Sequence, residues 1–402
     1  MTPDQAQDMP EHNPKLFNPR KVSVTEARVG LVHDWLPLYG GAERVLEQIL
    51  HVFPKSNLYS LIDSLPKNER SFIMDKVVRT SLVQKLPFGK EEYRHYFPLM
   101  PLAVEQFDLS RYQIIITSSY AFAKGVLSGP DQLHICFCHS PVRYAWDLQH
   151  QYLANGLKSN RVMRWFTRLL LHYVRIWDTR TSNGVDHFVT NSHYVARRIR
   201  KVYRRPAEVI YPPVDVDAFQ LETKKDDFYL TASRMVPYKR IDLIVEAFST
   251  MPDKTLIVIG DGPDYKKIEA LAGPNVKLLG YQSDEVLRDH MRRCKAFVFA
   301  AEEDFGITPV EAQACGTPVI AFAKGGVTET VLPDETGMFF EAQTVTSLVN
   351  AIRRYEEIYT SIRPERCREN AERFSIPRFR REFTACVERE WLKFHGSDQL
   401  PD

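Results

Sequence analysis

The feature that most constrains this chain is a repeated alternation of short apolar strands and amphipathic helices. From Arg28, the segment RVGLV runs into the loop HDWLPLYGG and then into the helical pattern AERVLEQILHVF. Further strand candidates in the first half are QIIITSS, LHICFCH, DHFVTNS and AEVIYPP. Such alternation requires helical crossovers between parallel strands. The first half therefore predicts a doubly wound α/β domain.

A second series of the same kind follows a break in the pattern. Around YPPVDVDAFQLETKKDD the apolar spacing stops, and paired prolines with a charge run predict a linker. The strand candidates DFYLTAS, TLIVIG, VKLLG, AFVFAA and PVIAFA then alternate with helices again. Because 402 residues exceed what one core usually supports, two domains are expected. We predict two Rossmann-like domains that face each other across a cleft, where such sheets bind their ligands.

The composition shift along the chain suggests the boundaries. Residues 1–27 are polar and proline-containing, and we expect a flexible leader. The N-terminal Rossmann-like domain is predicted over residues 28–218 and the C-terminal one over residues 219–375. A terminal helix over residues 376–395 is expected to join the N-terminal domain.

Charge and cysteine content exclude several classes of protein. The 53 basic and 51 acidic residues nearly cancel, so the net charge does not indicate a partner that is a nucleic acid. The six cysteines have neither metal-site spacing nor the density of a disulfide scaffold. No apolar run approaches the ~20 residues of a membrane span, and the polar start has no signal-peptide core. We therefore expect a cytoplasmic protein.

Residues 302–330, EEDFGITPVEAQACGTPVIAFAKGGVTET, carry the strongest indication of chemistry. Glu303 follows a predicted buried strand, which places it in the cleft. Thr308 and Pro309 predict a helix start, with Thr308 as the N-cap. Glu311 either caps that helix or lies beside a phosphate held by the backbone before it. Carboxylates beside an anion site are suited to binding the hydroxyls of a sugar or a ribose.

Glu303 and Glu311, with DFGITPV between them, resemble the E-x7-E signature of the retaining family-4 glycosyltransferases, which have the GT-B fold. The segments SRMVPYKRIDLIVEAF and VIGDGPDYKKIEAL extend the resemblance upstream. In the first half, HDWLPLYGGAERV, ICFCHSPVRYAWDLQ and VIYPPVDVDAF resemble bacterial mannosyltransferases of O-antigen (lipopolysaccharide) and exopolysaccharide assembly. The resemblance implies transfer of a sugar, most simply mannose from GDP-mannose, onto a polyprenyl-diphosphate-linked oligosaccharide.

The resemblance also implies a division of labour. The domain over residues 219–375 would bind the nucleotide sugar and the domain over 28–218 the acceptor. Departure of the diphosphate requires positive charge, which Arg234 and Lys239 would supply. Glu303 would face the transferred sugar, and His139 would bind one of its hydroxyls. Donor contacts are expected from Gly40, Gly41, Gly280, Tyr281, Phe305, Gly306, Ile307 and Glu311, with Glu311 on the ribose.

Two other motifs are read as structural. Asp215-Val216-Asp217 has the form of a metal-binding D-x-D but lies in the predicted linker, and we expect no metal and no further cofactor. Gly260-Asp261-Gly262 lacks the third glycine of a dinucleotide fingerprint, and we interpret it as a turn near the nucleotide. Retention could follow from attack on the face that the leaving diphosphate occupies, with that diphosphate taking the acceptor proton, or from a covalent intermediate. Because the two glutamates are the only obvious nucleophiles, we expect the same-face route.

Basic residues are concentrated between Lys158 and Arg205, where twelve Lys or Arg face two acidic residues. On a helix at about 100° per residue, Arg161, Arg164, Arg168, His172 and Arg175 share one face. This face is either a solvated edge or a surface for anionic lipid, which would bring the lipid-linked acceptor and the inner face of the cytoplasmic membrane to the protein. No nucleic-acid-binding motif accompanies it.

Other functions stay open at this stage. A nucleotide-sugar epimerase shares the fold, and a glycosyltransferase with another donor or a soluble acceptor would carry the same motifs. An NAD oxidoreductase is disfavoured by the incomplete glycine fingerprint. A non-catalytic binding protein is disfavoured by the presence together of Arg234, Lys239, Glu303 and Glu311.

Overall fold

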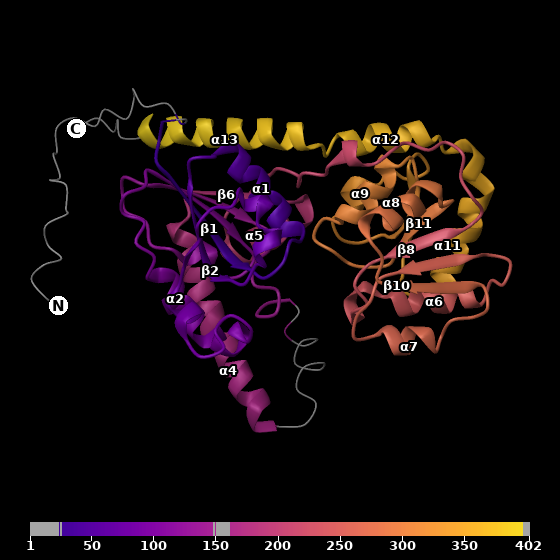
Figure 1. The fold of residues 1–402 in the computed structure, drawn as a ribbon, viewed down its shortest axis with the longest axis horizontal. Helices are drawn as coiled ribbons and strands as arrows, with labels where there is room; N and C mark the ends of the chain where they lie inside the picture. The colour runs from indigo at the N-terminus through magenta and orange to yellow at the C-terminus, as the bar shows by residue number, and fades with distance from the viewer. Residues whose placement is uncertain (1–23, 25, 148, 150–160, 397–402) are drawn as a thin grey trace, which may run out of the picture.

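The computed structural model describes residues 24, 26–147, 149 and 161–396, which form two α/β domains that lie side by side (Figure 1). Each domain has one sheet, of seven and six strands respectively. Every strand pairing in the two sheets is parallel. The predicted fold of two doubly wound Rossmann-like domains is therefore confirmed.

The N-terminal sheet has the strand order β3-β2-β1-β4-β5-β6-β7. Its strands are β1 (Val29–Leu36), β2 (Asn57–Asp63), β3 (Arg79–Thr80), β4 (Ile114–Ser119), β5 (Leu133–Cys138), β6 (His187–Thr190) and β7 (Glu208–Val209). The register pairs His33 with Ser118 and Ser119 with Cys138. Because parallel strands end at the same edge, this register gathers the polar ends of β1, β4 and β5 at one place.

Helices cover both faces of the N-terminal sheet. On one face, α1 (Gly41–Val52) and α13 (Ile376–Gly396) pack on alternate residues of β1, β4 and β5. The other face is covered by α2 (Met100–Glu105), α4 (Arg161–Thr181) and α5 (His193–Tyr203). Within α4 only the side that carries Leu171, Val174 and Trp177 is buried. The rest of α4 projects from the domain (Figure 1).

The C-terminal sheet has the order β10-β9-β8-β11-β12-β13. Its strands are β8 (Tyr229–Ala232), β9 (Leu256–Ile259), β10 (Val276–Gly280), β11 (Ala296–Phe299), β12 (Val319–Phe322) and β13 (Gly337–Phe340). Its helices are α6 (Ile241–Ser249), α7 (Tyr265–Glu269), α8 (Asp284–Arg293), α9 (Ile307–Ala314), α10 (Val327–Thr330), α11 (Val345–Ile358) and α12 (Pro364–Glu372). Helices α6 and α11 pack on one face, and α8, α9 and α12 on the other.

Strands β2, β3 and β13 were not among the predicted ones. In β2 the apolar run is interrupted by Ser60, whose hydroxyl donates to the carbonyl of Ile62 (2.8 Å). Strand β13 consists of only four residues that follow a turn. Each is held by pairing with a neighbouring strand: β2 with β1, β3 with β2, and β13 with β12. Such tertiary support is not visible in a local pattern.

The last helix connects the two domains through the apolar core. Helix α12 packs in the C-terminal domain, and the chain then crosses so that α13 lies along the N-terminal domain (Figure 1). The rings of Phe379 and Phe383 stack at 5.7 Å and both contact Phe137 of β5. At the crossing, the Val214 N–H donates to the carbonyl of Phe374 (2.8 Å). The two chain crossings therefore lie side by side.

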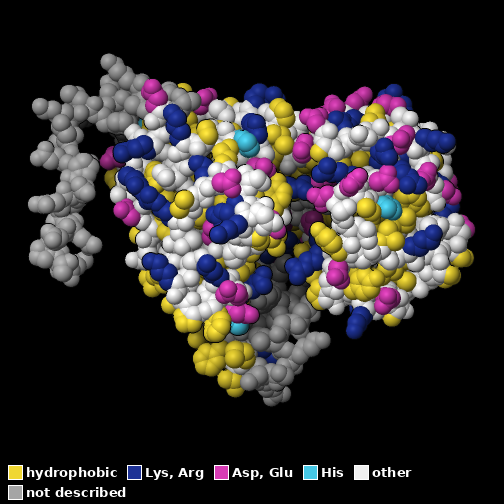
Figure 2. Space-filling model, in the orientation of Figure 1, with side chains coloured by type: hydrophobic (Ala, Val, Ile, Leu, Met, Phe, Trp, Pro, Cys, Tyr) yellow, Lys and Arg dark blue, Asp and Glu magenta, His cyan; other side chains and the backbone are white. Residues whose placement is uncertain are grey.

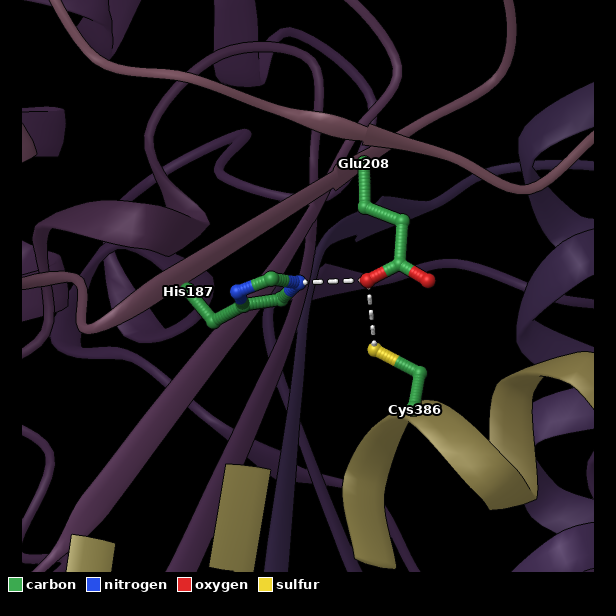
Figure 3. A group of neighbouring side chains, drawn as sticks. All are labelled: His187, Glu208 and Cys386. Atoms are coloured by element: carbon green, nitrogen blue, oxygen red, sulfur yellow. Dashed lines mark hydrogen bonds and ion pairs between the residues drawn. The ribbon is translucent and has the colours of Figure 1, made fainter. Parts of the chain in front are cut away.

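A polar cluster fastens α13 to the edge of the N-terminal sheet (Figure 3). His187 lies 2.9 Å from Glu208, and the Cys386 thiol donates to the same carboxylate at 3.5 Å. These residue types could hold zinc, but the Arg389 guanidinium already donates to Glu208. Burial raises the pKa of Cys386 to about 12, which keeps it a thiol. The cluster is therefore an ion-paired clamp on the helix.

Among the helices within the described ranges, none is long and apolar enough to cross a membrane.

The packing of α13 makes a quantitative prediction. Phe383 is fully buried in the N-terminal core, so Phe383→Ala should leave a cavity and lower the free energy of unfolding by about 3–5 kcal/mol. Urea denaturation measures the change. On the same helix Leu392 is 72% exposed, and Leu392→Ala should alter the free energy by at most about 0.5 kcal/mol. Equal effects of the two substitutions would contradict the packing described.

Candidate functional site

A hollow lies between the two domains, and Lys and Arg side chains lie along it (Figure 2). A cavity of about 590 Å³ is lined by the C-terminal domain, at the ends of β8 and β9, and by Arg44 of the N-terminal domain. Its lining includes Arg44, Ser233, Arg234, Gly260, Asp261, Tyr281, Asp284, Thr308 and Glu311. A second cavity of about 220 Å³ shares Arg44, Asp284 and Glu311 with the first. The cleft can thus hold an elongated ligand between the domains.

The turn before α9 sets the position of Glu311. The helix begins at Ile307 with Gly306 as its N-cap, so the predicted start with Thr308 as the cap is wrong. Gly306 has φ +87°, a left-handed conformation that glycine adopts readily and other residues avoid. Glu311 does not cap its own helix, because its Oε1 accepts from the Arg44 guanidinium of α1 at 2.5 Å. This ion pair joins the two domains across the cleft.

Lys239 and Glu303 form an ion pair on the C-terminal side of the cleft. Lys239 ends the short helical turn Pro237–Lys239 after β8, and Glu303 follows β11. Both side chains are about four-fifths buried. This burial lowers the pKa of Lys239 to about 8. Arg234, at the end of β8, is exposed and lines the larger cavity.

The acidic residues on either side of Glu303 bind the opposite domain. The Glu302 carboxylate accepts from the Tyr194 hydroxyl at 2.5 Å. The Asp304 carboxylate accepts from the Arg198 guanidinium at 2.7 Å and lies 3.5 Å from Arg143. The middle carboxylate therefore faces Lys239, while its neighbours hold the strand end against the N-terminal domain.

Arg198 contacts two loops, the one after β5 that carries His139 and the one after β11 that carries Glu303. One of its nitrogens donates to Asp304, the residue after Glu303, and to the Ser140 hydroxyl at 3.1 Å. Ser140 directly follows His139, so one guanidinium connects the two loops. The Arg198 side chain is only 9% exposed, and it donates a further bond to Asp147 (2.9 Å).

A third cross-domain contact lies at the start of α5. The Glu329 carboxylate accepts from the backbone N–H groups of His193 and Tyr194, both at 2.8 Å. A carboxylate at the N-terminus of a helix is favoured by the free N–H groups and by the helix dipole. The loop before Glu329 approaches the acidic strand end closely, since a Cβ on Gly326 would lie 2.4 Å from the Asp304 carbonyl oxygen. Only glycine fits there.

His139 follows β5 and directly precedes Ser140, whose hydroxyl contacts Arg198. Its Nε2 is 2.9 Å from the Ser118 hydroxyl. Burial is the main cause that lowers its pKa, to about 3, and His33 adds to the effect. The ring is therefore neutral near pH 7 and can exchange hydrogen bonds with neutral hydroxyl groups.

Of the remaining predicted donor contacts, Tyr281 lines the larger cavity, whereas Gly40, Gly41, Gly280 and Phe305 are not part of its lining. Gly40 is the N-cap of α1, and a Cβ on Gly41 would lie 3.3 Å from the Ile307 side chain of the other domain. Gly280 ends β10 with φ +68°, and Tyr281 is 81% exposed on the cavity wall. The Phe305 side chain is buried against Tyr211 and Phe374. Only the backbone of Phe305 remains for a ligand.

Sequence reasoning missed three residues of the site. Arg44 and Asp284 line both cavities, and Arg198 joins the two loops. Arg44 had a detectable signature, because a cation in the first turn of a helix opposes the dipole and needs a reason to be there. Asp284 and Arg198 had none, since each lies on an ordinary charged helix.

The predicted basic face of α4 lies outside the cleft and differs from expectation. Arg168 is exposed, whereas Arg164 is half-buried. Arg175 is turned inward, where it donates to the Ala145 carbonyl (2.8 Å) and to Gln149 (2.5 Å). The predicted place of Arg175 on a free basic surface is therefore wrong, because backbone and amide acceptors hold it. The side chain of Arg161 lies outside what the structure describes.

The outer side of α4 is instead apolar. Hydrophobic side chains gather at its projecting end (Figure 2). The exposed residues are Val162, Met163, Trp165, Phe166, Leu169, Tyr173 and Ile176, each 48–62% exposed. Val162, Phe166, Leu169, Tyr173 and Ile176 follow helical spacing and form one stripe. We call these seven residues the α4 apolar surface.

Two sequence families match the chain along nearly its whole folded length. The family described as Glycosyltransferase Family 4 matches residues 39–218, and that described as Glycosyl transferases group 1 matches residues 215–374. An uncharacterized glycosyltransferase of Methanocaldococcus jannaschii is 32% identical over 177 residues, 43% of this chain and 50% of its own. A Corynebacterium glutamicum protein is 31% identical over 195 residues, 41% of this chain and 51% of its own. It is named a GDP-mannose-dependent monoacylated alpha-(1-6)-phosphatidylinositol monomannoside mannosyltransferase. The chain thus spans about half the length of these curated relatives.

Solved structures share the fold at low identity. Anabaena HepE in complex with UDP and glucose has a TM-score of 0.66 at 19% identity, with 90% of this chain and 99% of that chain covered. Sucrose-phosphate synthase from Thermosynechococcus elongatus has a TM-score of 0.70 at 17% identity, with 91% and 100% covered. Both similarities support the two-domain architecture.

The cross-domain contacts predict how the cleft opens. A charge-assisted hydrogen bond of this kind contributes about 1.5–3 kcal/mol, so Arg198→Met should favour the open arrangement of the domains by roughly tenfold or more. Small-angle scattering should show a larger radius of gyration for Arg198→Met and for Asp304→Asn, and no further increase when the two are combined. Arg200→Met, an exposed arginine on the same helix, is the matched control. Additive increases from the two substitutions would argue against a shared contact.

Proposed function

The chain belongs to the family-4 glycosyltransferases with the GT-B fold, and from this we propose that it moves a sugar from a nucleotide diphosphate onto an acceptor with retention of configuration. The observation that supports the proposal is that Arg234 and Glu311 line one cavity between the domains, while Lys239 pairs with Glu303 beside the two acidic residues that contact the N-terminal domain. Two cations and two carboxylates there match the phosphates and the hydroxyls of such a donor.

The proposed reaction assigns each group a place. The bond between the sugar carbon and the diphosphate oxygen breaks, and Arg234 and Lys239 stabilise the charge that develops on the diphosphate. A bond to the acceptor oxygen forms on the same face, and the acceptor proton passes to the departing diphosphate. Glu303 and His139 would hold the transferred sugar, and Glu311 the ribose. The cationic side chains supply the charge stabilisation, so we propose that no metal ion or other cofactor is needed.

We further propose that the donor is GDP-mannose. Guanine presents two adjacent donors, its N1–H and its N2 amino group, which suit a carboxylate. Asp284 places a carboxylate on the wall of the cavity, at the start of α8. The mannosyltransferase names of two relatives, one from Corynebacterium glutamicum and one from Mycolicibacterium smegmatis, support this choice. A UDP-sugar is the alternative, since uracil offers only one donor between two acceptors.

The proposed acceptor is a sugar chain on a polyprenyl diphosphate at the inner face of the cytoplasmic membrane. The α4 apolar surface supports this part of the proposal, because Trp, Tyr, Phe and aliphatic side chains on a projecting helix suit the boundary between headgroups and acyl chains. Exposed Arg168 on the same helix would meet anionic headgroups. The lipid would then present its sugar chain to the N-terminal domain.

A screen of nucleotide sugars tests the donor. GDP-mannose should raise the melting temperature, since a ligand that binds only the folded state stabilises it. Asp284→Asn should weaken GDP-mannose binding by roughly 10–100-fold, the loss of a charged hydrogen-bond acceptor, and leave UDP-glucose unchanged. Glu285→Gln, the exposed neighbour outside the cavity, is the control. Stabilisation by UDP-glucose alone would overturn the GDP assignment, and absence of any shift with either donor would overturn the transferase proposal.

Vesicle co-sedimentation tests the membrane contact. Replacing Trp165 and Phe166 by Ser removes two large apolar side chains of the α4 apolar surface, so binding to phosphatidylglycerol vesicles should fall by at least tenfold. The control is Val77→Ser, at an exposed apolar residue outside α4 that is 88% accessible. This variant should bind the vesicles as the unmodified protein does. Equal binding of all three proteins would remove this surface from the proposal.

A further inference from the structure

A chain of buried polar groups runs from the loop before α1 to His139. The Gly40 N–H donates to Glu43 Oε2 at 3.0 Å, and Glu43 Oε1 lies 3.2 Å from His33 Nε2. His33 Nδ1 lies 3.0 Å from the Ser118 hydroxyl, which in turn lies 2.9 Å from His139 Nε2. His33 and Ser118 are fully buried, and Glu43 is 6% exposed. Strands β1 and β4, the residue after β5 and helix α1 therefore supply one continuous series of hydrogen bonds.

The chemistry of the partners determines which atom is the donor in each of these hydrogen bonds. A carboxylate only accepts, so the proton on His33 lies on Nε2 and points to Glu43. A neutral His33 then accepts at Nδ1 from the Ser118 O–H. The Ser118 oxygen in turn accepts from His139, which places the His139 proton on Nε2. Every link then has one donor and one acceptor, and the chain carries a single charge, on Glu43.

The opposite direction would need a second proton on fully buried His33. The other nearby carboxylate, Asp34, does not join the chain, because it accepts from the backbone N–H groups of Tyr120, Ala121, Phe122 and Ala123 at 2.6–2.8 Å. The remaining close neighbours of the two imidazoles are the rings of Tyr120 and Phe137. Glu43 is thus the charged group in this series of hydrogen bonds. A single proton on His33, at Nε2, gives its carboxylate a donor.

We propose that Glu43, His33 and Ser118 are positioning residues that hold His139 in the Nε2-protonated tautomer and leave its Nδ1 free to accept a hydrogen bond from a hydroxyl of the transferred sugar. Nδ1 is the nitrogen left over, since within the described part of the chain no residue hydrogen-bonds to it. A ring nitrogen is commonly committed in this way by the hydrogen bond that the other nitrogen makes. The contact with the sugar rests on the proposed function, whereas the tautomer does not.

The same chain connects His139 to the start of α1. Glu43 is the third residue of that helix, and its second carboxylate oxygen caps the free N–H of Gly40. Gly40 and Gly41 begin the helix next to Ile307 of the other domain. The orientation of His139 is therefore coupled to the loop that carries the predicted donor contacts Gly40 and Gly41.

The tautomer can be measured directly on the full-length chain. Nitrogen-15 NMR of protein labelled at its histidines distinguishes Nε2–H from Nδ1–H, and His139→Gln identifies the relevant signals among the 12 histidines. We expect the Nε2–H form alone for His139 near pH 7, and a mixture of both forms in Ser118→Ala. Ser119→Ala, at the next residue of β4 and outside the chain, should leave the signals unchanged. An Nδ1–H form in the unmodified protein, or an unchanged signal in Ser118→Ala, overturns the proposal.

Kinetics provides the second readout, with GDP-mannose as the donor. Ser118→Ala should lower kcat by about tenfold, the loss of one oriented hydrogen bond, with KM for the donor changed by less than about twofold. Ser118→Thr, which keeps the hydroxyl, should recover part of the rate. If Ser118→Ala does not fold, Glu43→Gln tests the chain from its other end and should also give a mixture of tautomers. A protein that turns over no nucleotide sugar contradicts the proposed function, while the NMR result still decides the tautomer.

Discussion

The structure depends on how the acidic strand end of β11 is neutralised. Three consecutive carboxylates, Glu302, Glu303 and Asp304, follow a buried strand, and carboxylates removed from water need partners nearby. The C-terminal domain supplies Lys239 to the middle one, whereas Tyr194 and Arg198 of the N-terminal domain meet the outer two. The site is therefore complete only when the domains are together. Domain closure and the placement of Glu303 follow from the same interactions.

The two connections between the domains differ in physical character. The crossing into α13 is apolar and lasting, because Phe379 and Phe383 belong to the N-terminal core while α12 belongs to the C-terminal one. The cleft contacts are ionic, partly exposed to solvent and weakened by salt. Opening can thus break the charged contacts while the apolar crossing stays intact. A polar ligand that offers its own phosphates and hydroxyls can replace those contacts at low net cost.

Much of this could be predicted from the sequence, and the failures have specific causes. The strand and helix alternation sufficed for the fold, because burial on both faces of a parallel sheet leaves a plain periodicity. The positions of Glu303 and Glu311 came from a motif. Arg44 and Arg198 could not be found locally, since their partners Glu311 and Asp304 lie 267 and 106 residues away. The start of α9 was misplaced because a left-handed glycine replaced the expected side-chain cap.

The charges in the cleft are divided in a way that suits the proposed chemistry. Arg44 and Arg234 line the cavity, and Lys239 lies against Glu303, so the proposed donor would have cations available for its diphosphate. His139, which we propose to meet the sugar, is neutral because burial lowers its pKa to about 3. A sugar that loses its phosphate develops positive charge at its reacting carbon, and a second cation beside it would oppose that change. A neutral histidine that accepts a hydrogen bond stabilises the sugar without this penalty. The buried chain from Glu43 to Ser118 provides such a group, because it fixes the ring without giving it a charge.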